Sequence, residues 1–156
     1  MYVTARADYG LRAAVELAGD GTVAHTVAQL ATAQTIPPRF LENILLILRH
    51  AGLLQSRRGP DGGFRLARPA DKITLAEILS ALEGPLPSIH GVAATELVYE
   101  GFASALRDVW LAVSANLGSV LANTTLEDVA SGQLPRDLRR LLAETRAAPS
   151  LGPAAS

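Results

Sequence analysis

The stretch RRGPDGGF, from Arg57 to Phe64, sets the narrowest limit on how this 156-residue chain can fold. Glycine takes backbone conformations that are closed to other residues, and a Pro-Asp-Gly run favours a tight turn. The segments on either side, residues 53–58 and 63–68, have the length and pattern of short strands. We therefore expect one small hairpin in a chain whose other segments have helical patterns.

Three helices are expected before the hairpin. They are predicted over residues 5–18, 27–34 and 39–51. Thr4 is placed to cap the first helix, and Thr26 with Gln29 forms a capping-box pattern that opens the second. Two adjacent prolines stand at the first turn of the third helix, where proline is favoured, and Gly52 ends that helix.

The third of these helices has two different faces. An apolar stripe, predicted to face the core, consists of Phe40, Ile44, Leu45 and Leu48, whereas Arg39, Glu42, Asn43 and Leu46 fall on another face. The polar side chains on the second face are candidates for binding a partner.

A long helix is expected in the second half of the chain. A shorter helix, capped by Thr74 and ending near Leu82, precedes it. The long helix is predicted over residues 95–122, roughly 40 Å at 1.5 Å per residue. Its apolar seam, with spacings of four and three, consists of Val98, Phe102, Leu106, Val109, Val113, Leu117 and Val120. Such a seam is typical of a helix that packs on a partner chain, although it could also fold back on its own domain.

The chain divides into four expected segments. They are a helix-and-hairpin domain (1–84), a loop (85–94), the long helix with a short following helix (95–132), and a C-terminal segment (133–156). Thr124 with Glu127 offers a capping box for the short helix, which is predicted to run through Ala130. The tail from Ala147 is expected to be disordered.

Composition excludes several kinds of site. The chain has no cysteine, so it has no disulfide, no thiolate zinc site, no cysteine nucleophile and no all-cysteine iron–sulfur cluster. Its three histidines lack metal-ligand spacing, and neither an HExxH helix nor a GxSxG turn is present. We therefore expect no metal, no cofactor and no enzymatic activity. No apolar segment is long enough to span a membrane, and no signal core is found, so a cytoplasmic protein with no membrane partner is expected.

The net charge of −1 hides an uneven distribution. Residues 1–72 carry a balance of +3, and residues 73–156 carry a balance of −4. This asymmetry indicates a basic module joined to an acidic one.

The order helix, short helix, turn, helix and hairpin is that of a winged helix-turn-helix. Such a domain places the second helix of the helix-turn-helix pair, here the third helix of the chain, in the DNA major groove. The candidate DNA-binding residues are Pro38, Arg39, Glu42, Asn43 and Arg49 on that helix, and Arg57, Arg58, Gly59, Gly62 and Gly63 in the hairpin. Arginine can pair with guanine, asparagine with adenine, and glutamate with the amino group of cytosine. Arginine is also favoured in a narrow minor groove, although an arginine pair beside a hairpin is more often a solvated edge.

The chain closely resembles the Rrf-type family of bacterial regulators over about residues 1–132. The resemblance lies in TARADYGLRAAVELA, in PPRFLENILLILRHAGLLQSRRGPDGGFRLAR, in ITLAEILSALEG and in TTLEDVA. It implies a mostly α fold with a small β-hairpin, a winged helix-turn-helix domain plus a long dimerisation helix that crosses its twin. It also implies a homodimer that represses or activates promoters. By position, Arg39, Glu42 and Arg58 match residues with which family members contact DNA.

The chain departs from part of that family. Iron–sulfur members carry three cysteines around the loop before the long helix, where this chain has PLPSIHGVAA. Asp8 stands where some nitric-oxide-sensing members supply a carboxylate ligand, and here we interpret it as a polar residue that makes a local contact. His90 lies in the cysteine-free loop, and it is either solvated or a switch that protonates near pH 6.5. Asp8 and His90 are therefore the candidate sensor residues.

Two functions remain open from the sequence. The first is a sequence-specific DNA-binding regulator, expected to be a repressor, that acts as a homodimer without a cluster. Double-stranded DNA is its expected partner, and a small molecule or a protein is its candidate effector. The second is a winged-helix dimer that has lost DNA affinity and binds proteins. The net charge of −1 and the acidic Glu42 favour this alternative slightly, whereas the intact basic hairpin argues against it.

Overall fold

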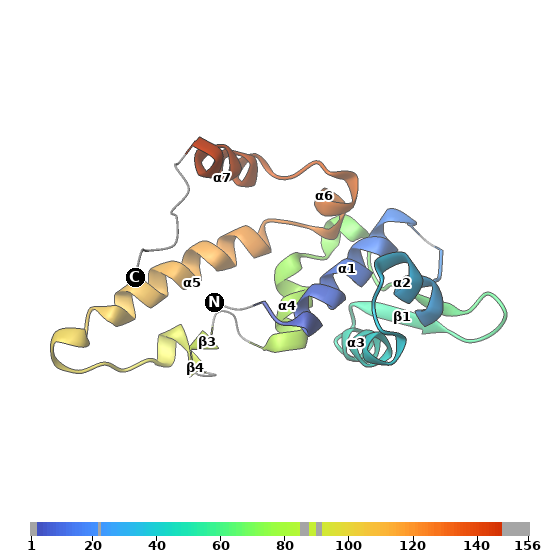
Figure 1. Ribbon diagram of the computed structural model, residues 1–156, viewed down its shortest axis with the longest axis horizontal. Helices are drawn as coiled ribbons and strands as arrows, with labels where there is room; N and C mark the ends of the chain where they lie inside the picture. Colours follow the sequence, from blue (N-terminus) through green and yellow to red (C-terminus); the bar gives the residue numbers. More distant parts are fainter. Residues whose placement is uncertain (1–2, 22, 85–87, 90–91, 148–156) are drawn as a thin grey trace, which may run out of the picture.

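The computed structural model describes residues 3–21, 23–84, 88–89 and 92–147. Its first part contains three helices, a hairpin and a further helix, in the predicted order (Figure 1). The elements are α1 (Ala5–Gly19), α2 (Val27–Gln34), α3 (Pro38–His50), β1 (Leu54–Arg57), β2 (Gly63–Leu66), the 3-10 turn η1 (Ala70–Lys72) and α4 (Leu75–Glu83). The strands pair antiparallel, with Leu54 opposite Leu66 and Arg57 opposite Gly63. The predicted hairpin is therefore confirmed, with each strand two residues shorter than expected.

The second part of the chain is less regular than its sequence pattern indicates. Its elements are β3 (Ser88–Ile89), β4 (Val92–Ala93), η2 (Ala94–Glu96), η3 (Gly101–Ala103), α5 (Leu106–Ala122), α6 (Leu126–Ser131) and α7 (Arg136–Ala147). Two short strands thus pair within the segment predicted to be a loop. Helix α7 lies in the C-terminal segment, for which no helix was predicted. The tail was predicted to be disordered from Ala147. That residue is the last of α7, and residues 148–156 lie outside the described residues.

The long helix was predicted to begin at Thr95, and this is wrong. Within residues 94–105 there are instead two 3-10 turns, η2 and η3, and α5 begins at Leu106. Gly101 has a φ of 59°, in the left-handed region, which interrupts a right-handed helix. The 17 residues of α5 span roughly 25 Å rather than 40 Å. An apolar repeat alone did not reveal this interruption.

Local hydrogen bonds explain where the helices begin. The Thr4 hydroxyl accepts a bond from the Ala7 amide at 3.0 Å, and the capping box predicted at Thr26 is formed. Thr74 caps α4 as predicted, and it forms a capping box with Glu77. The box predicted at Thr124 is wrong by one residue. Thr125 caps α6 with Asp128, whereas the buried Thr124 donates its hydroxyl to the carbonyl of Val120 at 2.7 Å.

The core lies around α1, which packs against α2, α3, α4 and α6. It is aliphatic, and its fully buried large side chains include Leu17, Leu30, Leu41, Ile44, Leu45, Leu48, Ile73, Ile78 and Leu126. Gly10 is needed where α1 and α4 cross, because a β-carbon there would overlap the side chain of Leu82. Helix α6 joins this core through a backbone bond from the Leu126 amide to the Ile73 carbonyl at 2.9 Å.

Helix α3 faces the core with a slightly different stripe from the predicted one. Leu41, Ile44, Leu45 and Leu48 are fully buried, whereas Phe40 is 41% exposed. Spacings of three, four and seven residues place the four buried positions on one face, and Phe40 stands to the side of that face. The Phe40 ring packs edge-on against Tyr9 of α1, with 5.7 Å between ring centroids. The prediction that Phe40 faces the core is therefore wrong, and Leu41 takes its place.

Candidate nucleic-acid interface

Helices α2 and α3 form a tight helix-turn-helix. Thr35 takes a left-handed conformation, with a φ of 54°, and ends α2. The next residue, Ile36, is buried, and its amide donates to the Ala31 carbonyl at 2.9 Å. Pro37 and Pro38 then start α3 without a side-chain cap. The turn is therefore fixed at both ends before the exposed face of α3 begins.

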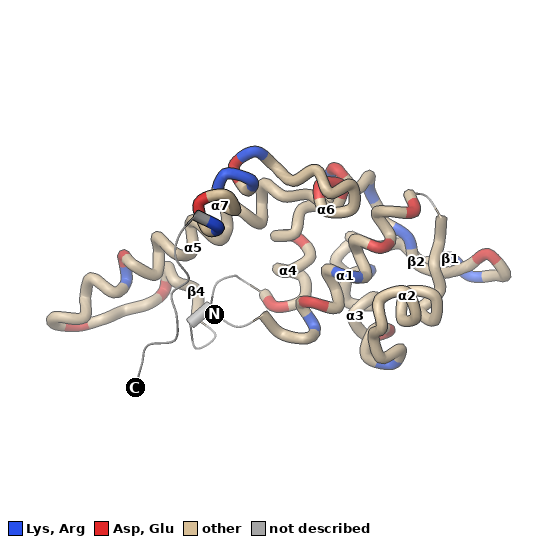
Figure 2. The backbone as a smooth tube through the Cα atoms, turned by 45° about the horizontal axis from the view of Figure 1, so that its top comes forward, with Lys and Arg blue, Asp and Glu red and all other residues tan. Residues whose placement is uncertain are grey.

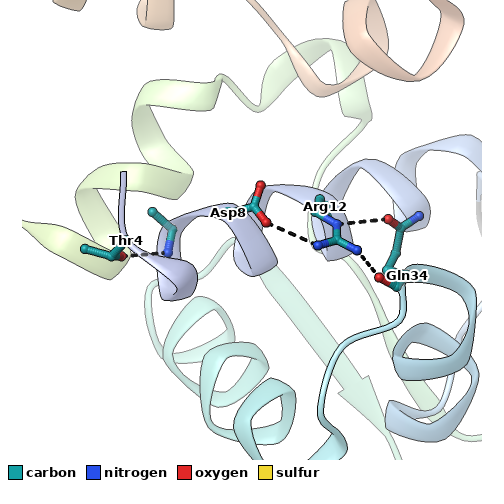
Figure 3. A network of polar contacts seen from close by, with 5 residues as sticks. Thr4, Asp8, Arg12 and Gln34 are labelled. Carbon is teal, nitrogen blue, oxygen red and sulfur yellow. Dashed lines mark hydrogen bonds and ion pairs between the residues drawn. The ribbon is translucent and has the colours of Figure 1, made fainter. Parts of the chain in front are cut away.

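Helix α1 holds this turn through Arg12. The Arg12 guanidinium donates to the backbone carbonyl of Gln34, and its Nε donates to the Gln34 side-chain oxygen at 3.3 Å (Figure 3). The same guanidinium pairs with Asp8 at 3.2 Å and lies 5.5 Å from the centre of the Tyr9 ring. Asp8 therefore makes the local contact that was predicted for it, and this contact helps to orient the arginine.

The first half of α3 leaves its outer face uncovered. Pro38, Arg39, Glu42 and Asn43 are all exposed, and they come from the first two turns. His50, which was not among the predicted residues, is also exposed. It stands seven residues after Asn43, so it extends the same face by two turns. That heptad spacing is the signal that could have identified it.

The hairpin β1–β2 with its turn, residues 54–66, is called the wing below. Arg57, Arg58 and the tip residues up to Asp61 are exposed. The tip is closed by a bond from the Gly62 amide to the Gly59 carbonyl at 2.9 Å. A β-carbon at Gly62 would lie 2.5 Å from the Arg57 carbonyl oxygen, which leaves no room for another side chain. The glycines thus allow a tight tip that presents both arginines to solvent.

The wing is anchored to the segment just before α2. Phe64 exchanges two backbone bonds with His25, at 2.7 and 2.8 Å, and its side chain is buried. Gly63 has a φ of 146°, and a β-carbon there would overlap the His25 carbonyl. His25 itself lies 2.7 Å from the Asp20 carboxylate. The sequence showed no signal for this anchor, because it joins residues far apart in the chain.

Arg49 connects α3 to the wing. Its guanidinium donates to the Ser56 hydroxyl of β1 at 3.2 Å and lies 3.4 Å from the His50 ring. Across the wing, Arg65 donates to Gln55 at 3.2 Å. Figure 2 shows both basic and acidic positions on the hairpin at this end of the molecule. The Arg49–Ser56 bond thus connects the last turn of α3 to strand β1 of the wing.

The predicted dimer seam is a second candidate surface. Val98, Phe102, Leu106, Val109 and Val113 are exposed, and the exposed fraction of Phe102 reaches 112%. Leu117 and Val120, near the C-terminal end of α5, are half-buried. The described chain therefore leaves most of this apolar seam uncovered, while the end of α5 packs against α4.

The candidate sensor residues and metal ligands occupy no common site. Asp8 is exposed and paired with Arg12, and His90 lies outside the described residues. Within the part of the chain that the structure describes, no group of three metal-ligating side chains comes together. Among the described helices, none is both long and apolar enough to cross a membrane.

Comparison with known proteins finds a family model and several relatives that match most of this chain. The family model of Rrf2, described as an iron-dependent transcriptional regulator, matches residues 3–132. A Mycobacterium tuberculosis protein, Rv1287, whose name assigns it to the HTH-type transcriptional regulators, is 46% identical over 149 residues, covering 94% of this chain and 92% of the relative. The HTH-type transcriptional regulator CymR of Bacillus subtilis is 34% identical over 134 residues, covering 84% and 91%.

Solved structures agree with these sequence matches. The structure of CymR, named the global cysteine regulator of B. subtilis, superposes with a TM-score of 0.74 at 30% identity, covering 85% of this chain and 98% of CymR. The structure of T. potens IscR superposes with a TM-score of 0.66 at 28% identity, covering 90% and 96%. Both matches extend beyond the winged domain into the second half of the chain.

Proposed function

The chain belongs to the Rrf2 family of helix-turn-helix transcriptional regulators, and from this we propose that it binds operator DNA as a homodimer and represses transcription. It is a regulator and not an enzyme. One observation carries the finer proposal. The first two turns of α3 and the tip of the wing are both uncovered. A bond of 3.2 Å from Arg49, in the last turn of α3, to Ser56 of β1 connects the helix to the wing.

The outer face of α3 offers the groups that read a major groove. Arg39 can donate twice to a guanine edge, Asn43 can pair with adenine, and Glu42 can accept from the amino group of cytosine. Arg57 and Arg58 at the wing tip match a narrow minor groove or the flanking phosphates. The α3 residues would therefore set the sequence preference, while the wing arginines would supply affinity.

The exposed seam of α5 supports the homodimer. A two-fold dimer uses the same patch on both chains, and an apolar helix face suits such a contact. The two copies of α3 would then meet successive major grooves, about 34–36 Å apart or a multiple of that distance. The operator is thus expected to be an inverted repeat.

The iron-dependent chemistry named for the family does not fit this chain. Cluster-binding sites use cysteine thiolates, and this chain has no cysteine. The described residues also bring together no alternative set of three ligands. We therefore propose regulation without a resident cluster, with a small molecule or a protein partner as the effector.

The test begins with genomic DNA capture by the purified chain, which identifies the operator, and continues with anisotropy titrations. A dimer that neutralises about 6–8 phosphates should show a slope near −6 when log affinity is plotted against log salt. Arg58→Ala should weaken operator binding about tenfold, and it should make the slope shallower by about two because a dimer loses two contacts. The matched control is Lys72→Ala, which removes an exposed cation that lies outside both α3 and the wing.

Two results would contradict the proposal. Unchanged operator affinity in Arg58→Ala would remove the wing from DNA binding. A chain that retains no double-stranded DNA at moderate salt would favour the alternative, a winged-helix dimer that binds proteins.

A further inference from the structure

Helix α7 has an apolar stripe that the described part of its own chain leaves uncovered. Leu138, Leu141 and Leu142 are spaced by three and four residues, so they share one face. Leu141 and Leu142 are 42% and 39% exposed. No described element packs closely along this helix. A helix of 12 residues is marginal in water by itself, so α7 needs a surface that covers this stripe.

A second surface, the segment of residues 94–109 that leads into α5, is uncovered in the same way. Val98 is 84% exposed and Phe102 is 112% exposed, and Leu106 and Val109 continue the apolar surface into α5. Exposed apolar side chains that gather on one surface of a soluble protein mark interaction sites. The leading segment therefore also needs a cover.

The two surfaces have opposite charges. Helix α7 carries four arginines, Arg136, Arg139, Arg140 and Arg146, against two acidic residues, Asp137 and Glu144. The leading segment carries three acidic residues, Glu96, Glu100 and Asp108, against Arg107 alone. Figure 2 shows the basic positions along α7 and the acidic positions around the turn that precedes α5. Apolar stripes flanked by complementary charges are what a specific helix contact requires.

Within one chain, the two surfaces lie toward opposite ends of α5. The leading segment comes before α5, and α7 follows its other end through α6 and residues 132–135. Figures 1 and 2 both show the turn before α5 at the far end of the molecule from α6, with α7 on the α6 side of that turn. An α5 of roughly 25 Å separates the two ends.

We propose that α7 of one chain packs on the leading segment of a second copy of this chain. The inference rests on the proposed homodimer. A two-fold axis across α5 makes the paired helices antiparallel, so the start of one α5 lies beside the end of the other. The leading segment of the second copy is then brought next to α7. Phe102 fills the space against Leu138, Leu141 and Leu142, while Glu96 and Glu100 face the arginines.

This contact would also connect the second copy to the DNA-binding domain of the first chain, because α7 is joined to that domain through α6. Helix α6, which precedes α7, is bound to η1 and α4 by the Leu126–Ile73 and Leu75–Thr124 backbone bonds, both at 2.9 Å. An exchanged α7 therefore fixes the second copy against the base of the first winged domain. It sets the angle between the two domains as well as the strength of the dimer.

The test uses the absence of cysteine in the chain. Phe102→Cys and Leu141→Cys are made in separate full-length chains, one of them carrying a mass tag, and then mixed and oxidised mildly. A disulfide requires Cα atoms within about 7 Å, so a tagged–untagged dimer on a non-reducing gel reports contact between different chains. Leu141→Cys mixed with Val23→Cys is the control, because Val23 is 55% exposed and lies away from α5. We expect at least about tenfold more cross-linked dimer in the test pair.

Val113→Cys alone separates this inference from the homodimer on which it rests. If Val113→Cys cross-links while the Phe102–Leu141 pair does not, the α5 dimer stands and the exchange of α7 is overturned. If neither cross-links, both are overturned. A chain that carries both substitutions, diluted into an excess of cysteine-free chain, should form little disulfide within itself. A dominant internal disulfide would show that α7 folds back on its own chain.

A charge exchange gives a second, independent readout. Arg140→Glu should weaken self-association about tenfold in sedimentation equilibrium, and Glu100→Arg in the same chain should restore most of it. Restoration is not expected if Arg140 merely stabilises α7. A double variant as weak as Arg140→Glu alone would contradict the pairing of these two surfaces.

Discussion

A single carboxylate, Glu83 at the end of α4, holds the beginning of α1. It accepts the Thr4 hydroxyl at 2.7 Å and the Arg6 guanidinium at 3.0 Å, and its side chain is 17% exposed. The bond from Arg6 lowers the pKa of Glu83 below its ordinary value of 4.5, although burial acts in the opposite direction. This contact closes α1 against α4, the pair whose close crossing needs Gly10.

The pKa of Glu83 makes part of the stability depend on pH. A carboxylate whose pKa is lower in the folded state stabilises that state above about 4.5, and this contribution is lost as pH falls through the folded pKa. Glu83→Gln should therefore lower the free energy of unfolding at pH 7 by about 1 kcal/mol, a modest value because Arg6 is partly exposed. Urea titrations from pH 7 to pH 3.5, at one chain concentration, measure the difference between variant and wild type.

The difference should shrink toward zero at the acidic end of that series. Asp71→Asn is the control, because its pair with Lys72 is exposed on both sides and should contribute little at any pH. A difference for Glu83→Gln that stays constant across the series would show that the lost energy comes from packing and not from charge.

At the scale of elements, the anchor between the wing and α2 depends on one glycine. Gly63→Ala adds a β-carbon that overlaps the His25 carbonyl, and it places alanine at a φ of 146°. We expect a loss of about 2–3 kcal/mol in the free energy of unfolding, because both the strain and the overlap act at this position. Urea unfolding measures the loss, and operator titration should show weaker binding as the wing moves.

Two other glycines separate the causes of that loss. Gly59 has a φ of 114°, but a β-carbon there meets no atom within 4 Å, so Gly59→Ala measures the strain alone. Gly19, at the end of α1, has neither strain nor a close neighbour, and Gly19→Ala should cost nothing. If Gly63→Ala and Gly59→Ala lose the same stability, the contact with His25 is not what requires glycine at residue 63.

The elements that sequence predicts well are those whose signals are local. Thr26 with Gln29 and Thr74 with Glu77 mark helix starts within four residues, and the glycines of the wing mark its turn. Apolar spacing predicted the buried face of α3 to within one position. It did not decide between Phe40 and Leu41, because the packing of Tyr9 against Phe40 comes from another helix.

The remaining differences arise from contacts that no local pattern contains. The apolar repeat of residues 95–122 continues through Gly101, so its break appeared only with the backbone conformation. The exposed residues of the candidate interface, such as Arg39 and Arg58, follow from the order of the elements. The bonds that fix them, from Arg49 to Ser56 and from Phe64 to His25, join separate elements and could not be predicted.

For the whole molecule, the uneven charge and the uncovered seam fit one arrangement. The winged domain carries the excess of basic residues, and the acidic second half carries most of the large apolar side chains that are exposed in the described residues. In the proposed homodimer, pairing through the second half would keep the acidic segments away from DNA and would turn two weakly basic domains into one larger binding surface. Operator affinity should then depend on residues that never contact DNA.

Val113→Asp tests that dependence. Val113 is 40% exposed in the middle of the α5 seam, and a charge there would have to be desolvated in a dimer. We expect the variant to sediment as a monomer at micromolar concentration and to bind the operator at least about 100-fold more weakly, because one half-site contact replaces two. Emission from the single tryptophan, Trp110, should shift because this residue stands three positions away on the same helix.

The matched control is Ala115→Asp, which adds the same charge to α5 at an exposed position on another face of the helix. It should remain a dimer with near wild-type operator affinity. If Val113→Asp also stays dimeric, the seam is not the interface. If it becomes a monomer yet binds the operator as tightly as the wild type, the two DNA-binding domains act independently, and the inverted-repeat operator loses its physical basis.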